Sequence, residues 1–257
     1  MTNRRPLILL TNDDGIHAEG LSYLSEVAAE FGEVSIVAPE SEQSAVGHAI
    51  TLYDPIKVHE INRDGRFYGY GIGGTPADAV KLAVHALLPR PPDLVLSGIN
   101  NGSNMGINVL YSGTVSAATE AAILGAPAMS FSIAQKKDPP FRWAAPHIRF
   151  LVQWILNRGL PAGLALNVNI PTLPPEMVRG YRLTHQCLSR FRESFEQRED
   201  PRGNKYFWMA GERPPENNGS DSDFAALTDG FVSITPLYYD LTAHNHAQEL
   251  AESLETM

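Results

Sequence analysis

The chain is poor in cysteine, in long apolar runs and in positive charge. Its single cysteine, Cys187, excludes an intrachain disulfide and is typical of a reducing compartment. No apolar stretch approaches the roughly 18 residues that a membrane-spanning helix needs. The N-terminus, MTNRRPLILL, has an apolar run too short for a signal peptide and no small-residue cleavage site. We therefore expect a cytoplasmic protein that makes no use of a membrane.

The net charge is −9, from 20 Lys and Arg against 29 Asp and Glu. A surface of this sign repels phosphate backbones, so we expect no nucleic-acid polymer as a partner. Three common signatures are also missing. There is no G-x-x-x-x-G-K-[ST] loop and no G-x-S-x-G elbow, and Gly71-Ile72-Gly73-Gly74 does not fit the dinucleotide fingerprint. P-loop enzymes are thereby excluded, and an α/β-hydrolase is disfavoured.

What the chain does have is an alternation of strand-like and helix-like segments over 257 residues. Short apolar runs between breakers predict buried strands, and apolar residues at helical spacing predict the helices between them. Thr75 and Pro76 are the expected N-cap and first residue of one further helix. This order favours an α/β fold with a mostly parallel sheet covered on both faces. The expected strands are 7–10, 34–38, 94–96, 128–132 and 164–170, and the expected helices are 18–31, 114–124 and 143–156.

Outside this alternation, the sequence changes character. Asn62-Arg63-Asp64-Gly65 is a hairpin signal between segments 49–61 and 66–72. After residue 171 the chain becomes rich in Pro, Arg and Glu, with Pro214–Ser220 expected as a loop. We expect one domain, 1–257, made of an α/β body (1–171) and an extension (172–257) used for oligomerisation. The extension is expected to contain a hairpin and a C-terminal helix, with short strands at 181–184, 206–209 and 231–234 and the helix at 243–254.

Two adjacent acids, Asp13 and Asp14, stand just past the carboxyl end of the first predicted strand, and Gly15 follows them. Ligands of open α/β sheets bind at this edge. Neighbouring carboxylates repel each other, and a hard cation such as Mg²⁺, Mn²⁺ or Ca²⁺ would relieve that repulsion. The alternative is a loop in which Asp serves turn hydrogen bonds and a helix N-cap. The pair alone does not decide between the two.

Two more oxygen-rich loops follow the next parallel strands. One contains Ser41, Gln43 and Ser44, and the other is Ser97–Asn104, the start of a long Gly/Asn/Ser loop that we expect to reach Gly113. These loops converge on one edge of a doubly wound sheet. Hard oxygen donors suit Mg²⁺ or Mn²⁺ better than Zn²⁺, because no Cys or His stands in the loops at zinc spacing.

Ser112-Gly113-Thr114 comes immediately before a predicted helix. Free N–H groups at a helix N-terminus, together with two hydroxyls, form a cradle for phosphate. The plainer interpretation is a Ser/Thr N-cap after a glycine turn, and by itself it is the more common one. A metal site and a phosphate cradle on the same edge would reinforce each other.

Taken together, these segments resemble the SurE family, the stationary-phase survival proteins. The resemblance runs from about residue 7 to residue 132 and returns at LNVNIP and VSITPL. It implies a Rossmann-like α/β/α body, a C-terminal arm exchanged between subunits, and homodimers or homotetramers. It also implies a metal-dependent phosphatase for nucleoside 5′- and 3′-monophosphates, in some members also for short polyphosphate. The segments that carry it are TNDDGIHAEG, VAPESEQSAVGHAIT, GTPADAV, LVLSGINNGSNMGINVLYSGTVSAATEAAILGAPAMSFS and VSITPL.

The resemblance also implies roles for individual residues. One divalent ion per subunit, Mg²⁺ or Mn²⁺, would be held by Asp13, Asp14, Ser44 and Asn100. The substrate phosphate would be held by Asn104, Ser112, Gly113 and Thr114. Two departures, Ile107-Asn108 where many members carry acids and Ala79 where many carry Cys, leave the metal set intact but leave substrate preference open.

The resulting hypothesis is a 5′-nucleotidase in which Asp13 and Asp14 are catalytic. The metal would lower the pKa of a bound water and neutralise charge on the phosphoryl group, and one carboxylate would orient or deprotonate that water. An aspartyl-phosphate intermediate is a further option. One rival is a non-catalytic sensor that binds nucleotide and metal. The other is a serine acyl hydrolase that uses Ser44 or Ser112 with a distant His.

Overall fold

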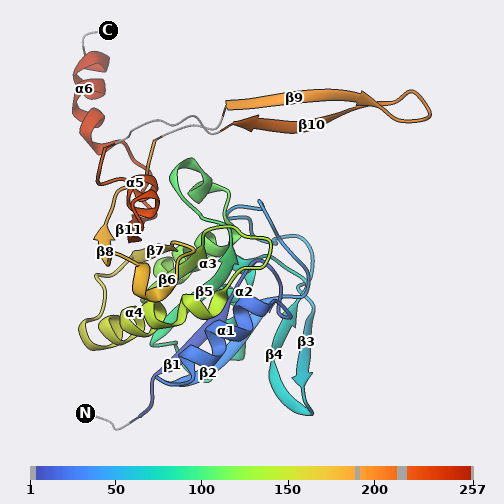
Figure 1. The fold of residues 1–257 in the computed structure, drawn as a ribbon, viewed down its shortest axis with the longest axis vertical. Coiled ribbons are helices and arrows are strands. Elements are labelled where there is room, and N and C mark those ends of the chain that lie inside the picture. The colour runs from blue at the N-terminus through green and yellow to red at the C-terminus, as the bar shows by residue number, and fades with distance from the viewer. Residues whose placement is uncertain (1–3, 189–191, 213–218, 256–257) are drawn as a thin grey trace.

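The structure is a computed structural model that describes residues 4–188, 192–212 and 219–255. A nine-stranded sheet, in the order β3-β4-β2-β1-β5-β6-β7-β11-β8, forms its centre (Figure 1). Seven strands come from the predicted body, and β8 and β11 come from the extension. The strands of this sheet are β1 Leu7–Thr11, β2 Glu33–Pro39, β3 Val58–Arg63, β4 Arg66–Ile72, β5 Leu94–Asn101, β6 Ala128–Ile133, β7 Leu164–Ile170, β8 Tyr181–Leu183 and β11 Val232–Tyr238.

The sheet is mostly parallel, as predicted. Strands β4, β2, β1, β5, β6 and β7 all run in one direction. At one edge β3 returns antiparallel to β4, and at the other β11 lies antiparallel to β7 and parallel to β8. The carboxyl ends of β1, β2 and β5 therefore share one edge, where the oxygen-rich loops are attached.

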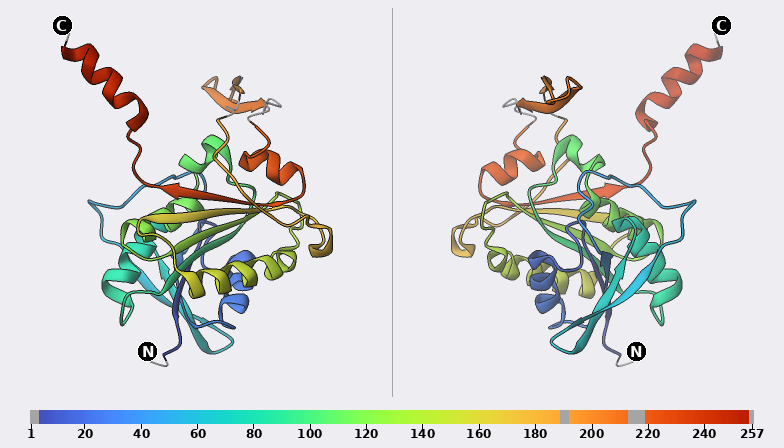
Figure 2. Two further views of the ribbon diagram at one scale, coloured as in Figure 1. Left: turned by 90° about the vertical axis from the view of Figure 1, so that its left-hand side faces the viewer. Right: turned by 90° about the vertical axis from the view of Figure 1, so that its right-hand side faces the viewer.

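Helices cover both faces of the sheet, which confirms the three-layer α/β/α fold (Figure 2). Helices α1 (Glu19–Ala28) and α4 (Ala145–Arg158) pack on one face with Ile8 and Leu10, and α2 (Pro76–Leu82) and α3 (Gly113–Ile123) pack on the other with Leu9. Successive residues of a strand point to opposite faces. Since both faces are buried, β1 must be apolar throughout, and this continuous run is the pattern that made the strand predictable.

Local signals explain most of the element boundaries. Thr75 caps α2 as predicted, with Asp78 completing a reciprocal capping box, and a π-helical turn, η1 (Ala83–Leu87), continues it. Pro146 lies in the first turn of α4, after the short 3₁₀ turn η3 (Phe141–Trp143). The predicted helix over 143–156 therefore begins at Ala145, because Trp143 belongs to that separate turn.

The predicted hairpin between β3 and β4 is present. Asp64 and Gly65 form its turn with φ of 52° and 74°, the left-handed conformation that such two-residue turns require. The first strand begins at Val58 and not at residue 49. The reason is that Thr51 bonds to the Asp78 carboxylate through its backbone N–H (2.9 Å) and its hydroxyl (2.7 Å), which ties this segment to the start of α2.

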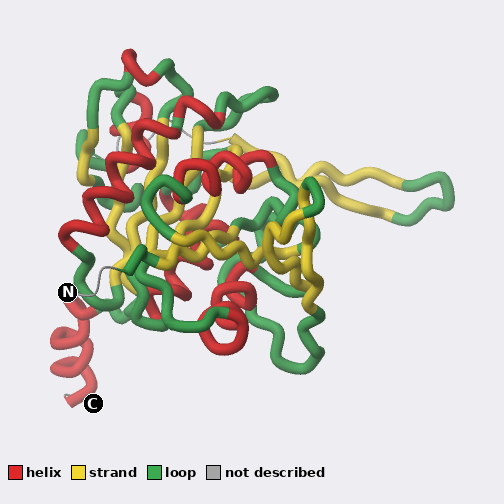
Figure 3. The backbone as a smooth tube through the Cα atoms, turned by 90° about the horizontal axis from the view of Figure 1, so that it is seen from below, coloured by secondary structure: helices red, strands yellow, loops and turns green. Residues whose placement is uncertain are grey.

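The extension divides into parts that join the body and parts that leave it. Strand β9 (Arg192–Glu199) pairs with β10 (Lys205–Glu212) in a separate hairpin that projects from the body, and α6 (His244–Glu255) leaves in another direction (Figures 1 and 3). Helix α5 (Asp223–Thr228) and the 3₁₀ turn η4 (Pro175–Met177) complete it. Residues 213–218 of the expected loop Pro214–Ser220 lie outside the described residues. Across the described ranges we find no helix with the length and apolarity that crossing a bilayer would require.

Candidate metal and phosphate site

The turn after β1 places Asp13 and Asp14 at the carboxyl edge of the sheet. Gly15 adopts φ +100°, and the Asn12 side-chain amide donates to the Gly15 carbonyl at 3.0 Å. The Ile16 N–H then donates to the Pro39 carbonyl at the end of β2 (2.8 Å). The turn bond comes from Asn12 and not from an acid, and α1 starts after Ala18 without a side-chain cap. The alternative in which Asp serves as the N-cap of this helix is therefore not what the structure shows.

Asp13 lies in contact with the start of α3. Its side chain is buried, with 6% of the residue exposed, and its Oδ1 accepts a hydrogen bond from the Thr114 hydroxyl at 2.5 Å. A Cβ on Gly113 would lie 2.7 Å from the Asp13 Cβ, so only glycine fits there. The structure therefore brings together three of the predicted residues, Asp13, Gly113 and Thr114, from segments that are about 100 positions apart.

The second loop reaches the same place through its backbone. The Gln43 N–H donates to the Asp13 carbonyl at 2.7 Å. The neighbouring Ser44 hydroxyl donates to Glu42 Oε1 at 2.5 Å. Glu42 was not among the predicted site residues, although an acid two positions before a candidate ligand serine is a visible signal.

Burial and mutual repulsion define the electrostatics of the site. Burial raises the pKa of Asp13. The pKa of Asp14 is raised to about 6, first by burial and then by the negative charges of Asp13 and Glu42. Because the carboxylates of Asp13, Asp14 and Glu42 repel one another, the site favours uptake of a proton or a cation. Within the described residues no group of three His, Cys, Asp or Glu has the arrangement of a metal cluster, so an ion here would need hydroxyl and amide ligands as well.

Asn100 lies on strand β5 and not in an open loop. The prediction of an unstructured segment over 97–113 was wrong in part, because β5 continues to Asn101 and Gly106–Leu110 forms the 3₁₀ turn η2. Asn100 pairs with Ser132 of β6 beyond a register shift, and a Cβ on Gly98 would lie 2.3 Å from the Phe131 carbonyl oxygen. The Asn100 amide nitrogen donates to the Gly102 carbonyl at 2.7 Å, so its carboxamide oxygen is the atom available to a cation.

Asn104 is held by polar side chains of β6 and β7. Its side-chain amide donates to Ser132 Oγ at 3.0 Å, and its backbone N–H donates to Asn169 Oδ1 at 2.8 Å. The Asn104 carbonyl accepts from the Asn167 amide at 2.7 Å. Buried asparagines in the middle of a sheet are costly unless they are bonded. Here they fix the loop that follows β5.

A buried carboxylate of the extension holds the next turn of the same loop. Asp223 is fully buried and accepts from the N–H groups of Gly106 (2.8 Å) and Cys187 (3.1 Å). The Gln186 amide donates to the Gly106 carbonyl at 2.8 Å. Asp223 was not among the predicted site residues, and its only local signal is its place after the N-cap Ser222.

Ser112 is the N-cap of α3, accepting from the Val115 N–H at 3.1 Å. The plainer interpretation of Ser112 is therefore right. It does not displace the phosphate interpretation, because the capped helix begins beside Asp13 and points its N-terminus at the same edge.

Unsatisfied polar atoms mark the same edge. Among the described residues, the buried oxygens Thr11 Oγ1, Asn12 Oδ1 and Ser97 Oγ have no hydrogen-bond partner. Thr11 and Ser97 are paired across β1 and β5, and Asn12 precedes Asp13. Buried polar atoms are normally satisfied by protein, water or an ion. The oxygen-rich donor set and these orphaned atoms fit a hydrated hard cation.

Known proteins are similar to this chain over most of its length. The family profile described as "Survival protein SurE" matches residues 8–193. Two relatives named 5′-nucleotidase SurE are 49% identical over 92% of this chain and 90% of their own (Syntrophus aciditrophicus) and 47% identical over 96% of both chains (Moorella thermoacetica). The crystal structure of the SurE protein from Aquifex aeolicus superposes with a TM-score of 0.85 at 38% identity, covering 97% of this chain and 100% of that one.

Proposed function

Because the chain belongs to the SurE family, we propose that it is a metal-dependent 5′-nucleotidase that hydrolyses nucleoside 5′-monophosphates to nucleoside and phosphate. The observation that carries this proposal is the meeting of Asp13 with the N-terminus of α3, through the Thr114 hydroxyl at 2.5 Å. A cation-binding carboxylate and a phosphate-binding helix start are thereby placed side by side, which is the combination that phosphoryl transfer needs.

We assign one divalent ion per subunit, Mg²⁺ or Mn²⁺, to Asp13, Asp14, Ser44 and Asn100. Their carboxylate, hydroxyl and carboxamide oxygens are hard donors that leave room for waters. When bound, the ion lowers the pKa of a water and offsets charge on the phosphoryl group. Because the Ser44 hydroxyl donates its proton to Glu42, the lone pairs of the Ser44 oxygen stay available to a cation.

The phosphate is assigned to Asn104, Ser112, Gly113 and Thr114. These residues stand at the start of α3, where the helix dipole favours the charge of an anion. Asn104 lies in the loop after β5, where its side-chain amide is oriented by Ser132 of β6. Donors held in place before the reaction stabilise the charge that develops on the equatorial oxygens.

The two carboxylates take different parts in this proposal. Asp13 is engaged by Thr114 and lies against Gly113, so it serves to hold the ion and the helix start together. Asp14 is only half-buried and its pKa is raised to about 6, which suits a group that orients the attacking water and takes its proton.

The test is phosphate release from 5′-AMP with added Mn²⁺, against a sample treated with chelator. Asp14→Asn should remove most of the metal-dependent turnover and leave the circular dichroism spectrum unchanged. Near-native turnover by a folded Asp14→Asn protein would contradict the assignment. The same assay on 3′-AMP and short polyphosphate defines the substrate range.

The assay also separates the rivals. A sensor would bind 5′-AMP with Mn²⁺ and release no phosphate. A serine acyl hydrolase would turn over esters in the presence of chelator. The structure disfavours the hydrolase, because the Ser44 hydroxyl bonds to Glu42 and the Ser112 hydroxyl caps α3, and neither meets a histidine among the described residues.

We further propose that the extension, 172–257, assembles the protein into a homodimer or homotetramer by exchange of its arm. Leu250 and Leu254 of α6 are 62% and 72% exposed, and Phe207 and Trp208 of the projecting hairpin are 58% and 59% exposed. Apolar side chains gathered on such projecting elements are typical of interfaces between subunits. Analytical ultracentrifugation measures the subunit number directly.

A further inference from the structure

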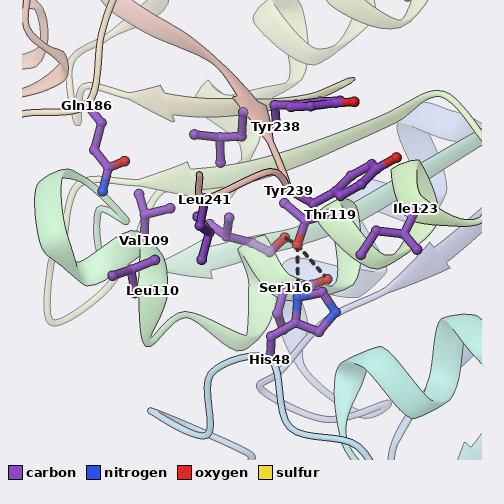
Figure 4. Close-up of a pocket in the computed structure, with 12 residues that line it drawn as sticks. His48, Val109, Leu110, Ser116, Thr119, Ile123, Gln186, Tyr238, Tyr239 and Leu241 are labelled. Atoms are coloured by element: carbon purple, nitrogen blue, oxygen red, sulfur yellow. Dashed lines mark hydrogen bonds between the residues drawn. The ribbon is translucent and has the colours of Figure 1, made fainter. Parts of the chain in front are cut away.

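A cavity of about 270 Å³ lies beside the first turns of α3 (Figure 4). Helix α3 forms its floor, η2 and Gln186 close one side, and the chain that leaves β11 forms the roof. This volume is close to the roughly 300 Å³ at which small-molecule sites begin. The lining residues used below are His48, Leu110, Thr119, Ile123, Gln186 and Tyr239.

The cavity lies close to the proposed phosphate site. Ser116 and Thr119 line it, and both lie on the face of α3 that begins at its N-cap Ser112, about one and two turns further along the helix. On the other side, His48 follows Ser44 by four residues. The Gly47 N–H donates to the Tyr111 carbonyl at 3.0 Å and holds this loop against the one that leads into α3.

The His48 ring is fixed in the wall. Its Nε2 lies 2.7 Å from Glu120 Oε2, and its Nδ1 lies 3.3 Å from the Thr119 hydroxyl. The pKa of Glu120 lies below its usual value. Burial acts to raise this pKa, but the hydrogen bonds from His48 and Lys81 outweigh burial. The imidazole therefore presents a flat face of constant orientation to a ligand.

The remaining walls combine apolar surface with one hydrogen-bonding group. The rings of Tyr238 and Tyr239 lie 4.7 Å apart, on the opposite side of the cavity from His48 (Figure 4). Leu110 and Ile123 supply aliphatic surface between them. Because the Gln186 amide nitrogen donates to Gly106, the carboxamide oxygen is the atom turned toward the cavity, where it can accept a hydrogen bond.

We propose that this cavity binds the nucleoside part of the substrate, with the phosphate at the start of α3 and the base between His48 and the tyrosines. The inference rests on the proposed nucleotidase function. Flat rings and aliphatic side chains stack on any nucleobase, and a single acceptor selects for exocyclic amino groups. A concave site joined to the phosphate end fits a nucleoside better than the surface of a second copy of the chain.

The first experiment compares substrates with and without a nucleoside. Ile123→Trp fills the cavity from a position that is 44% exposed, so the fold should tolerate it. The KM for 5′-AMP should rise at least tenfold, while kcat/KM for glycerol 2-phosphate should stay within twofold. Tyr239→Ala should act in the same direction. The matched control is Leu227→Trp in a separate cavity of about 290 Å³. This variant should leave kcat and KM unchanged for both substrates.

Equal losses for both substrates, or no change for 5′-AMP, would overturn the assignment. A changed subunit number by light scattering with unchanged 5′-AMP kinetics would show that the cavity is an interface between copies, and would overturn it as well.

The second experiment separates this inference from the nucleotidase proposal. Adenosine carries no phosphate, so its binding to the chelated protein, followed by saturation-transfer NMR, needs neither metal nor turnover. Binding by the parent chain that Ile123→Trp abolishes supports the cavity even if no phosphate is released from any substrate. Absence of adenosine binding by the parent chain would overturn it.

Discussion

The carboxyl edge of the sheet and the two projecting parts of the extension are opposite kinds of surface. At the edge, hydrogen bonds tie Asp13 and Asn104 to segments distant in sequence, and Ser112 is fixed as the N-cap of α3. The hairpin and α6 instead expose large apolar side chains such as Trp208 and Leu254. Fixed polar groups are what catalysis requires, and exposed apolar groups are what association requires. Chemistry and assembly should therefore respond to different substitutions.

The largest effect on chemistry is expected from Gly113→Ala. Its new Cβ would lie 2.7 Å from the Asp13 Cβ and 3.0 Å from its Oδ2, so the carboxylate must move away from Thr114. Displacement of a catalytic group by about 1 Å costs about 100-fold in rate. We expect kcat/KM for 5′-AMP to fall by at least that factor. Gly73→Ala is the matched control, because its Cβ would meet only Lys57 at 3.8 Å; equal losses in both variants would refute the steric argument.

A smaller effect is expected from Asp223→Asn, where the edge and the extension meet. The variant loses a buried charged acceptor for the Gly106 and Cys187 N–H groups, which should lower the free energy of unfolding in urea by about 2 kcal/mol. Because the loop that carries Asn104 is loosened, KM for 5′-AMP should rise more than kcat falls. Asp221→Asn, at a side chain that is 74% exposed, is the control and should change stability by under about 0.5 kcal/mol.

A smaller effect is expected on the way that the stability of the metal-free protein changes with pH, and Asp14 is its source. The pKa of Asp14 is raised from 3.8 to about 6, so the folded state holds its proton more tightly than the unfolded state. The resulting stability is present below pH 4 and is lost as pH rises through about 6. In chelator, Tm should therefore fall more between pH 4.5 and 7 in the parent chain than in Asp14→Asn, by about 5 °C.

Added Mn²⁺ at pH 7 should raise Tm in the parent chain and not in Asp14→Asn, because a bound ion offsets the carboxylate repulsion. Parallel curves for the two proteins in chelator would contradict this electrostatic account of the pair.

The smallest effect on chemistry is expected from Leu250→Glu with Leu254→Glu on α6. These side chains are mostly exposed in the single chain, so monomer stability should hardly change. The subunit number in ultracentrifugation should fall, while kcat for 5′-AMP stays within about twofold. Loss of turnover together with dissociation would mean that the site is incomplete without the partner, against the separation of the two regions.

Sequence reasoning was accurate where local pattern decides the structure. The apolar run of β1, the Asp64-Gly65 turn and the Thr75 and Ser112 caps all have short-range causes, and each is present as predicted. Placing the acids at a strand end was sufficient to predict that loops distant in sequence would meet there. The contact between Asp13 and Thr114 is consistent with that expectation.

It was less accurate where distant residues decide. Strand β5 continues beyond its apolar core because β6 offers backbone partners as far as Ile133, which no local pattern of glycine and asparagine reveals. Asp223 bonds to Gly106 across 117 positions, and no motif in the neighbouring sequence gave a reason to select it. Strand β9 was also missed, because its charged residues carry no apolar alternation and only pairing with β10 makes it a strand.

The most direct test of the central claim is a titration of metal into the chelated protein with 5′-AMP as substrate. If Asp13, Asp14, Ser44 and Asn100 hold one catalytic ion, phosphate release should be absent in chelator and should return with Mn²⁺, reaching its plateau at one bound ion per subunit. Release that continues in chelator, or none at saturating Mn²⁺, would contradict the account.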